Sequence, residues 1–198
     1  METKADRQRL REVFSQINPL SEEEWGQFEP MLETETVRKN DFLIREGQVA
    51  KHIYFICEGM VRVYLKGAPK EISLDFAFEH TFVSSYASFL QQIPSAVSIE
   101  AFMETRVIRF SRDHLYQRYE ASHMAERMGR LIAEFQYLRK NSREIALLKY
   151  PATQRYLQLL KQQPRLVQEI PVKYLASYLG VEPESLSRIR KSLGEVIS

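Results

Sequence analysis

The residues with the clearest capacity for specific chemistry lie near the C-terminal end of the chain, between Pro183 and Lys191. An arginine side chain can donate two hydrogen bonds to the major-groove edge of guanine, and a glutamate can accept one from the amino group of cytosine. Serine, lysine and arginine side chains also bind backbone phosphates. Six residues of this stretch are therefore candidate nucleic-acid contacts: Glu184, Ser185, Ser187, Arg188, Arg190 and Lys191.

The sequence around these residues predicts two short helices that would position them. Within 172–191, apolar residues recur at the spacing at which two steeply crossing helices touch. They are Leu175, Leu179, Val181, Leu186 and Ile189. Gly180 stands where the first helix must end, and Pro183 suits the first turn of the second, where its missing N–H costs nothing. The pattern predicts a helix-turn-helix, although a plain helical hairpin with solvated polar residues fits the same spacing.

The composition is that of a globular protein with one large or two small domains. The 198 residues are 44% apolar and 27% charged, which is typical of such proteins and sufficient to bury a substantial core. Residues 1–110 carry 13 Lys and Arg against 17 Asp and Glu, whereas residues 150–198 carry 7 against 4. An acidic front and a basic rear fit a sensor joined to a module that binds a polyanion.

Several classes of protein are excluded by what the sequence lacks. Cys57 is the single cysteine, so a disulfide framework and a four-cysteine zinc or iron–sulfur site cannot form within one chain. The apolar runs are too short for a membrane span, and the N-terminal segment has no apolar signal core. We therefore expect a cytoplasmic protein that does not engage a membrane.

The segment 34–110 has the pattern of a β-domain preceded by helices. Residues 1–32 predict two helices, the second with Ser21 and Glu24 as a capping box and with Leu20 and Trp25 as its hydrophobic staple. Many short strands without long intervening helices favour a β-sandwich or jelly roll, and 84–92 predicts a short helix inside it. The expected strands are the short β-rich runs at 42–46, 52–57, 60–65, 71–78, 97–102 and 105–110.

A short helix at 111–120 leads into a long helix at 121–149, about 40 Å in length. The long helix carries an apolar seam with heptad spacing. The seam consists of Met124, Met128, Leu131, Phe135, Leu138 and Ile145, with Ser142 completing the repeat. Such a seam could pack on the β-domain, but its strict spacing favours a two-fold coiled coil. We therefore predict a homodimer, which would supply two recognition helices.

The sequence predicts three parts in all. Tyr150-Pro151 ends the long helix, residues 152–163 form a further helix with Tyr156, Leu157 and Leu160 inward, and 164–171 form a short connection. The predicted domains are a sensor with N-terminal helices at 1–120, a dimerisation helix at 121–149 and a helix-turn-helix DNA-binding domain at 150–198.

Together these features resemble the Crp/Fnr family of bacterial transcription regulators, in which a cyclic-nucleotide-binding-type jelly roll precedes a dimerisation helix and a helix-turn-helix. The stretches that carry the resemblance are FLIREGQVAKHIYFICEGMVRVYL (42–65), PATQRYLQLL (151–160) and YLASYLGVEPESLSRIRKSL (174–193). The family pattern E-[ST]-x-x-R matches Glu184, Ser185 and Arg188. The resemblance implies that Arg188 reads guanine and Glu184 reads cytosine. It implies an α+β fold with an N-terminal β jelly roll (a double-stranded β-helix), flanking helices, the long helix and the helix-turn-helix.

The chain departs from the family at the nucleotide site. Members that bind cyclic AMP hold the ribose with a Gly-Glu pair and the cyclic phosphate with an Arg followed by Ser or Thr. Here Ser84-Ser85 and Pro94-Ser95 stand at those positions and mark the expected effector pocket. An anion without a countercharge loses a contact worth roughly 1.5–3 kcal/mol, so we predict that cyclic AMP does not bind by the usual route.

A second departure concerns the β-hairpin wing that follows the recognition helix in the family. Only GEVIS follows Leu193, so we expect a reduced or absent wing. Backbone contacts would then come in part from other cations, for which the candidates are Arg155, Lys161, Arg165 and Lys173.

Other sensor chemistries and an enzymatic role find little support. Cys57 fits a small core residue, and the sequence lacks serine elbows, phosphate-binding glycine loops and zinc spacings. The histidines, which form no recognisable ligand pair, are His52, His80, His114 and His123. We expect no enzyme activity, no cofactor and no metal. The expected partners are double-stranded DNA, a second copy, RNA polymerase and an unidentified small-molecule effector; the alternative is a ligand-binding module that acts on a protein partner.

Overall fold

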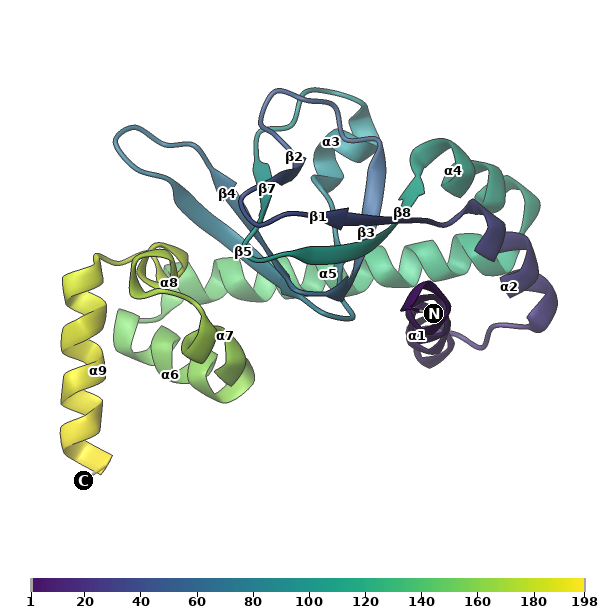
Figure 1. Ribbon diagram of the computed structural model, residues 1–198. Helices are drawn as coiled ribbons and strands as arrows, with labels where there is room; N and C mark the ends of the chain where they lie inside the picture. The colour runs from purple at the N-terminus through teal and green to yellow at the C-terminus, as the bar shows by residue number, and fades with distance from the viewer. Residues whose placement is uncertain (1, 198) are drawn as a thin grey trace.

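The computed structural model describes residues 2–197 as an α+β fold with two four-stranded antiparallel sheets between groups of helices (Figure 1). The chain begins with α1 (Glu2–Ile17), α2 (Glu22–Phe28) and the 3₁₀ turn η1 (Glu29–Met31). The strands are β1 (Glu33–Val37), β2 (Phe42–Ile44), β3 (His52–Glu58), β4 (Met60–Leu65), β5 (Ile72–Phe78), β6 (Phe82–Val83), β7 (Ser98–Ala101) and β8 (Thr105–Ser111). The other helices are α3 (Tyr86–Gln91), α4 (Arg112–Ala121), α5 (His123–Lys149), α6 (Ala152–Gln162), α7 (Pro164–Glu169), α8 (Val172–Leu179) and α9 (Pro183–Ile197).

The two sheets interleave strands from distant parts of the segment 33–111. Their orders are β1-β8-β3-β6 and β2-β7-β4-β5, so consecutive strands repeatedly cross from one sheet to the other, as in a jelly roll. The inner faces of both sheets meet in one apolar core. Ile56, Val61, Ile99 and Val107 are fully buried there. We refer to these eight strands together as the β-roll.

The outer face of the first sheet is covered by the N-terminal helices. Because successive side chains of a strand point to opposite faces, Phe55 of β3 faces outward while Ile56 faces the inner core. Phe55 packs in a cluster with Leu10 and Phe14 of α1 and Trp25 of α2. The sheet therefore buries both faces, which explains why β3 reads as a continuous apolar run.

The outer face of the second sheet is covered by the C-terminal helices. Met60 of β4 and Phe76 of β5 belong to the same buried cluster as Leu166 of α7 and Leu175 of α8. The phenyl ring of Phe76 meets the ring of Tyr178 of α8 edge to face, with centroids 5.8 Å apart. The C-terminal helices and the β-roll thus share one core instead of being joined only by a linker.

Helix α5 runs along the β-roll from the N-terminal helices to the C-terminal helices (Figure 1). It begins where the Ser122 hydroxyl accepts a hydrogen bond from the backbone N–H of Ala125 at 3.2 Å. It ends at Tyr150, whose extended backbone is what a residue before a proline adopts. α5 consequently contacts both ends of the molecule, α1 at one end and the backbone carbonyl of Tyr178 in α8 at the other.

The structure confirms the expected pair of N-terminal helices, the six expected strands, the short helix within 84–92 and the long helix. The short strands β1 and β6 were not among the expected runs, and 164–169 forms α7 where a plain connection was expected. The capping box is half formed: the backbone N–H of Glu24 donates to the Ser21 hydroxyl at 3.1 Å. The Glu24 carboxylate instead accepts from Arg118 and Ser122.

The predicted inward face of α6 is wrong by part of a turn. Tyr156 is buried as expected, but Leu157 and Leu160 are 43% and 38% exposed, and Leu159 takes the inward position at 7%. Tyr156 and Leu159 are three residues apart and therefore share one helical face, which packs in the cluster with α7 and α8. The tertiary contacts of α7, which the sequence did not reveal as a helix, set this rotation.

The neighbouring leucines of α6 provide a direct test of the rotation. Leu159→Ala should lower the free energy of unfolding by about 2–4 kcal/mol because it leaves a cavity in the core, whereas Leu160→Ala should change it by less than about 1 kcal/mol. Urea unfolding of both variants at one protein concentration measures the difference. Equal destabilisation by the two substitutions would contradict the observed orientation of α6.

Candidate functional site

Helices α8 and α9 are joined by a short turn of fixed geometry. Gly180 has φ +67° and ψ +39°, a left-handed conformation that glycine adopts without strain. The backbone N–H of Val181 donates to the carbonyl of Ala176 at 3.0 Å, which satisfies the end of α8. α9 then begins at Pro183, and Leu175, Ala176 and Leu186 are fully buried between the two helices. The inward residues of the predicted motif therefore do form its core.

Five of the six candidate DNA-contacting residues lie outside this core. Glu184, Ser187, Arg188 and Lys191 are exposed, and Ser185 is half-buried. Among the described residues, Glu184 and Arg188 have no side-chain hydrogen bond or ion pair, so both functional groups are available to a ligand. The hydroxyl of Ser187 donates to the carbonyl of Pro183 at 3.0 Å. α9 continues as helix through residues 194–197 of the GEVIS segment; Ser198 lies outside the described residues.

Arg190 differs from the other five candidates. Its guanidinium donates to the carbonyl of Val167 in α7 at 3.2 Å and lies 5.7 Å from the ring centre of Tyr156. A residue two positions beyond Arg188 points to a different face of the helix, and here that face packs on α6 and α7. The expectation that Arg190 faces outward is therefore corrected: it packs α9 against the rest of the domain.

Two of the four cations expected to contact the DNA backbone also make contacts within the protein. The guanidinium of Arg155 donates to the carbonyls of Leu179 and Tyr150, so it caps the C-terminal end of α8. Arg165 of α7 forms an ion pair with Glu79. The other two, Lys161 and Lys173, are exposed.

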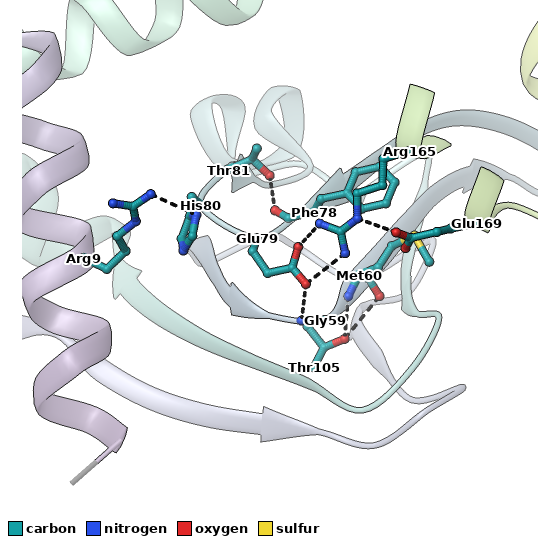
Figure 2. Close-up of polar contacts among 10 residues, drawn as sticks. All are labelled: Arg9, Gly59, Met60, Phe78, Glu79, His80, Thr81, Thr105, Arg165 and Glu169. Carbon is teal, nitrogen blue, oxygen red and sulfur yellow. Dashed lines mark hydrogen bonds and ion pairs between the residues drawn. The ribbon is translucent and has the colours of Figure 1, made fainter. Parts of the chain in front are cut away.

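The contact of Arg165 with Glu79 fastens the C-terminal helices to the turn after β5 (Figure 2). Arg165 also donates to Glu169 at 2.5 Å, and its guanidinium lies 4.7 Å from the ring centre of Phe78. Glu79 in turn accepts the backbone N–H of Gly59 at 3.2 Å. Burial raises the pKa of Glu79 and is the largest single effect, but the hydrogen bonds and charge of Arg165 and the backbone hydrogen bonds, including that from Gly59, together outweigh it. The net pKa of Glu79 therefore lies below its usual value, and the pair stays charged at neutral pH.

Arg62 of β4 lies against α8, and its role was not predicted from the sequence. Its side chain is 1% exposed and donates to Glu71 at 2.7 Å and to Ser73 at 3.0 Å. Its guanidinium lies between the rings of Tyr64 and of Tyr174 in α8, at 4.3 and 4.2 Å from their centres. The signal in the sequence is a lone charge inside the apolar run 60–65, which marks a strand position that another element covers.

A cleft of about 1510 Å³ extends along α5 between the β-roll, the N-terminal helices and the C-terminal helices. Its walls are mainly apolar, with Val63, Leu74, Val97 and Ile132 among the lining residues. Three of the four residues of the expected effector pocket line it: Ser84, Ser85 and Pro94. The position of the cleft lets one bound molecule touch the β-roll and α5 together.

The fourth expected pocket residue, Ser95, is buried and donates to the hydroxyl of Ser85 at 2.7 Å. The two family positions that would hold ribose and phosphate are therefore adjacent here, but they are occupied by hydroxyls that bond to each other. Cations of α4 and α5 do line the cleft, but Arg118 is paired with Glu24 and Arg139 with Asp75. Lys140 is the cation of this lining that has no partner among the described residues.

The heptad seam of α5 divides into two parts. Met128 is buried and Met124 is half-buried against the N-terminal helices, so this part of the predicted dimer seam is used within the chain. Leu131 is half-buried. Phe135, Leu138 and Ile145 are 67%, 60% and 47% exposed. These three form an unpartnered apolar stripe on the half of α5 nearest the C-terminal helices.

Cys57 and the acidic and histidine side chains offer no further reactive centre in the described part of the chain. Burial raises the pKa of the Cys57 thiol to about 12, which keeps it protonated and unreactive at neutral pH. No group of three or more His, Cys, Asp or Glu among residues 2–197 could hold a metal ion. No described helix has the length and apolarity that crossing a membrane requires.

The structure combines a β-roll, the long helix α5 and a C-terminal group of helices that ends in the α8–α9 pair. Residues 34–122 match the family of cyclic nucleotide-binding domains. Similar solved structures include the regulator CLP of Xanthomonas campestris, described as c-di-GMP responsive (TM-score 0.67, 18% identity, 86% of this chain and 90% of that one). FixK2 of Bradyrhizobium japonicum has TM-score 0.67, 22% identity and coverage of 83% and 85%. CooA of Carboxydothermus hydrogenoformans has TM-score 0.68, 17% identity and coverage of 92% and 84%. No curated protein is significantly similar in sequence.

Cyclic AMP should not bind this protein saturably. A cyclic phosphate placed near Ser85 and Ser95 would break their hydrogen bond without gaining a countercharge, at a loss of roughly 1.5–3 kcal/mol relative to a site with arginine. Calorimetric titration of the full chain with cyclic AMP measures this. Saturable binding would contradict this prediction, and its loss in the Ser85→Ala variant would place the nucleotide beside Ser85.

Proposed function

We propose that this chain is a sequence-specific DNA-binding transcription regulator of Crp/Fnr type that acts as a homodimer. The observation that carries the proposal is α9 itself. Its inner face is fixed by Leu186 in the core, and its outer face presents the unpaired side chains of Glu184 and Arg188. The similar folds of regulators support the proposal at the level of architecture.

The proposed base contacts follow from the chemistry of these two side chains. Arg188 would donate two hydrogen bonds to guanine, and Glu184 would accept one from a cytosine amino group. Ser185 and Lys191 would add contacts to bases or phosphates nearby. Glu184 and Arg188 are four residues apart on one helical face, so both can enter the same major groove.

The homodimer in this proposal rests on the apolar stripe Phe135, Leu138 and Ile145. An exposed apolar stripe with heptad spacing on a helix is the arrangement that a two-stranded coiled coil buries. Pairing α5 with its copy would place two α9 helices for the two half-sites of a near-palindromic operator. The β-roll would then act as the effector domain, with the cleft beside α5 as its ligand site and no binding of cyclic AMP by the usual route.

Substitutions of two arginines of α9 distinguish the loss of a base contact from the loss of protein stability. Arg188→Ala should lower the affinity for a selected operator by about 1–3 kcal/mol while leaving the affinity for random DNA and the stability nearly unchanged. Arg190→Ala should instead lower the stability because Arg190 packs on Val167 and Tyr156. Operators are first selected from a genomic pool at stated salt, and binding is then measured by fluorescence anisotropy. If the Arg188→Ala variant prefers the operator over random DNA as strongly as the unmodified protein does, the assignment of base contacts to Arg188 is wrong.

Substitution of two adjacent residues of α5 tests the proposed dimer interface. Leu138 lies on the stripe and Tyr137 lies off it, and both are exposed in the single chain at 60% and 67%. Leu138→Ala should weaken the dimer by about 1.5–3 kcal/mol per copy through lost apolar burial, and Tyr137→Ala should leave it unchanged. Sedimentation velocity over a concentration series measures both. A protein that is monomeric at all concentrations, or an equal effect of both substitutions, would argue against this interface.

A further inference from the structure

The hairpin between β4 and β5 projects from the β-roll on the side of the molecule where α8 and α9 lie (Figure 1). Hydrogen bonds join its second strand to α8. The backbone N–H of Ser73 donates to the hydroxyl of Ser177 at 2.9 Å, and that hydroxyl donates to the carbonyl of Glu71 at 3.2 Å. The hairpin and α8 are thus tied through backbone as well as side-chain groups.

Arg62 makes the base of the hairpin rigid with respect to α8. The guanidinium holds Glu71 and Ser73 of the hairpin on one side and stacks against Tyr174 of α8 on the other. Because Arg62 is 1% exposed, any tilt of the hairpin away from α8 would uncover a buried charge. The hairpin is therefore fastened to α8 by buried contacts.

The tip of the hairpin reaches the start of α9. Lys70 pairs with Glu182, the residue immediately before Pro183, at 2.5 and 2.6 Å to its two carboxylate oxygens. Lys66, on the other side of the tip, is exposed and has no polar partner among the described residues. Between the two lysines stand Gly67, Ala68 and Pro69, whose small side chains leave the tip narrow.

The charges around the tip leave an excess of positive charge. Glu71 is compensated by Arg62 and Glu182 by Lys70. Lys66 remains uncompensated, as does Lys173 in the first turn of α8 apart from its contact with the ring of Tyr174. Against these two cations stands the carboxylate of Glu184 in the first turn of α9, which is also unpaired within the described residues, so the net charge beside the tip remains positive. A positive charge at this place complements the phosphate backbone beside a major groove.

We propose that the β4–β5 hairpin is a second DNA-contacting element, in which Lys66 at its tip binds a backbone phosphate next to the groove that α9 enters. This proposal rests on the proposed function of α9. A lysine ammonium is a point charge and lacks the planar fork of donors with which arginine can read a base. The hairpin therefore adds affinity and helps to fix the register of the protein on the DNA, but it does not read bases. Its narrow tip allows close approach to the backbone.

The opposite role, in which the hairpin blocks α9, fits the contacts less well. Its ion pair is made with Glu182 in the turn, and Glu184 and Arg188 remain exposed and without a described partner. A blocking element would cover these side chains. The hairpin instead lies beside the start of α9, and the side chains of Glu184 and Arg188 remain uncovered.

The test compares Lys66→Ala with the matched variant Lys51→Ala. Lys51 is also exposed, and its carbonyl bonds to Arg112 at the start of α4, at the opposite end of the β-roll from α9 (Figure 1). Binding of the 198-residue chain to a selected operator and to a random duplex of equal length is titrated at several salt concentrations. Lys66→Ala should weaken both complexes about fivefold and reduce the salt slope by about 1 for each hairpin that touches the DNA.

The outcomes separate the hairpin from the base-reading helix. A phosphate contact predicts equal losses on operator and random DNA, whereas Arg188→Ala should affect the operator alone. If Lys66→Ala behaves like Lys51→Ala while Arg188→Ala still loses discrimination, the hairpin proposal is overturned and the proposed function stands. Tighter DNA binding by Lys66→Ala, or by Lys70→Ala that releases Glu182, would show a blocking role and also overturn the proposal.

Discussion

The arrangement of the C-terminal helices depends on one buried cation. Arg62 lies in the middle of β4 with 1% of its side chain exposed. A guanidinium removed from water must be compensated by an opposite charge, hydrogen bonds or aromatic faces. Arg62 obtains all three from Glu71, Ser73, Tyr64 and Tyr174. Because Tyr174 belongs to α8, the compensation of a strand residue requires the C-terminal helices to be docked.

Helix α5 makes a further series of contacts that joins the C-terminal helices to the β-roll. One of its faces carries polar contacts at intervals of a helical turn: Gln136 donates to the carbonyl of Phe82, Arg139 pairs with Asp75, and Arg143 donates to the carbonyl of Tyr178. These contacts reach β6, β5 and α8 in turn. The apolar stripe with Phe135 and Leu138 lies on a neighbouring face and remains exposed. α5 therefore separates contacts within the chain from the surface available to a second copy.

Local patterns in the sequence were sufficient to predict much of this fold. Period-two runs located the longer strands, and Gly180 with Pro183 located the turn before α9, because these signals depend on neighbouring residues alone. The missed features depend on distant contacts. β1 and β6 are short and gain their partners from β8 and β3, and Leu159 in place of Leu160 faces inward because α7 packs there.

In the candidate site, too, features that depend on neighbouring residues could be predicted from the sequence, and features that depend on distant contacts could not. Glu184, Ser185 and Arg188 were placed correctly on accessible positions of α9, since helical periodicity determines their direction. Arg190, Arg155 and Arg165 were not distinguishable from solvent-facing cations, because their partners Val167, Leu179 and Glu79 come from other elements. The role of Arg62 likewise becomes visible only when α8 is placed over β4.

The shared core limits how an effector in the cleft could control DNA binding in a regulator of the proposed kind. Detaching α8 from the β-roll would expose aromatic residues such as Phe76 and Tyr178, at about 1.5–3 kcal/mol for each large side chain, and would uncover Arg62 as well. Coupling between ligand sites is typically only about 1–3 kcal/mol. A ligand can shift an equilibrium only by its difference in affinity for the two states. The arrangement that a ligand beside α5 can change at this energy is therefore the pairing of two α5 helices, with each β-roll and its α9 moving as one body.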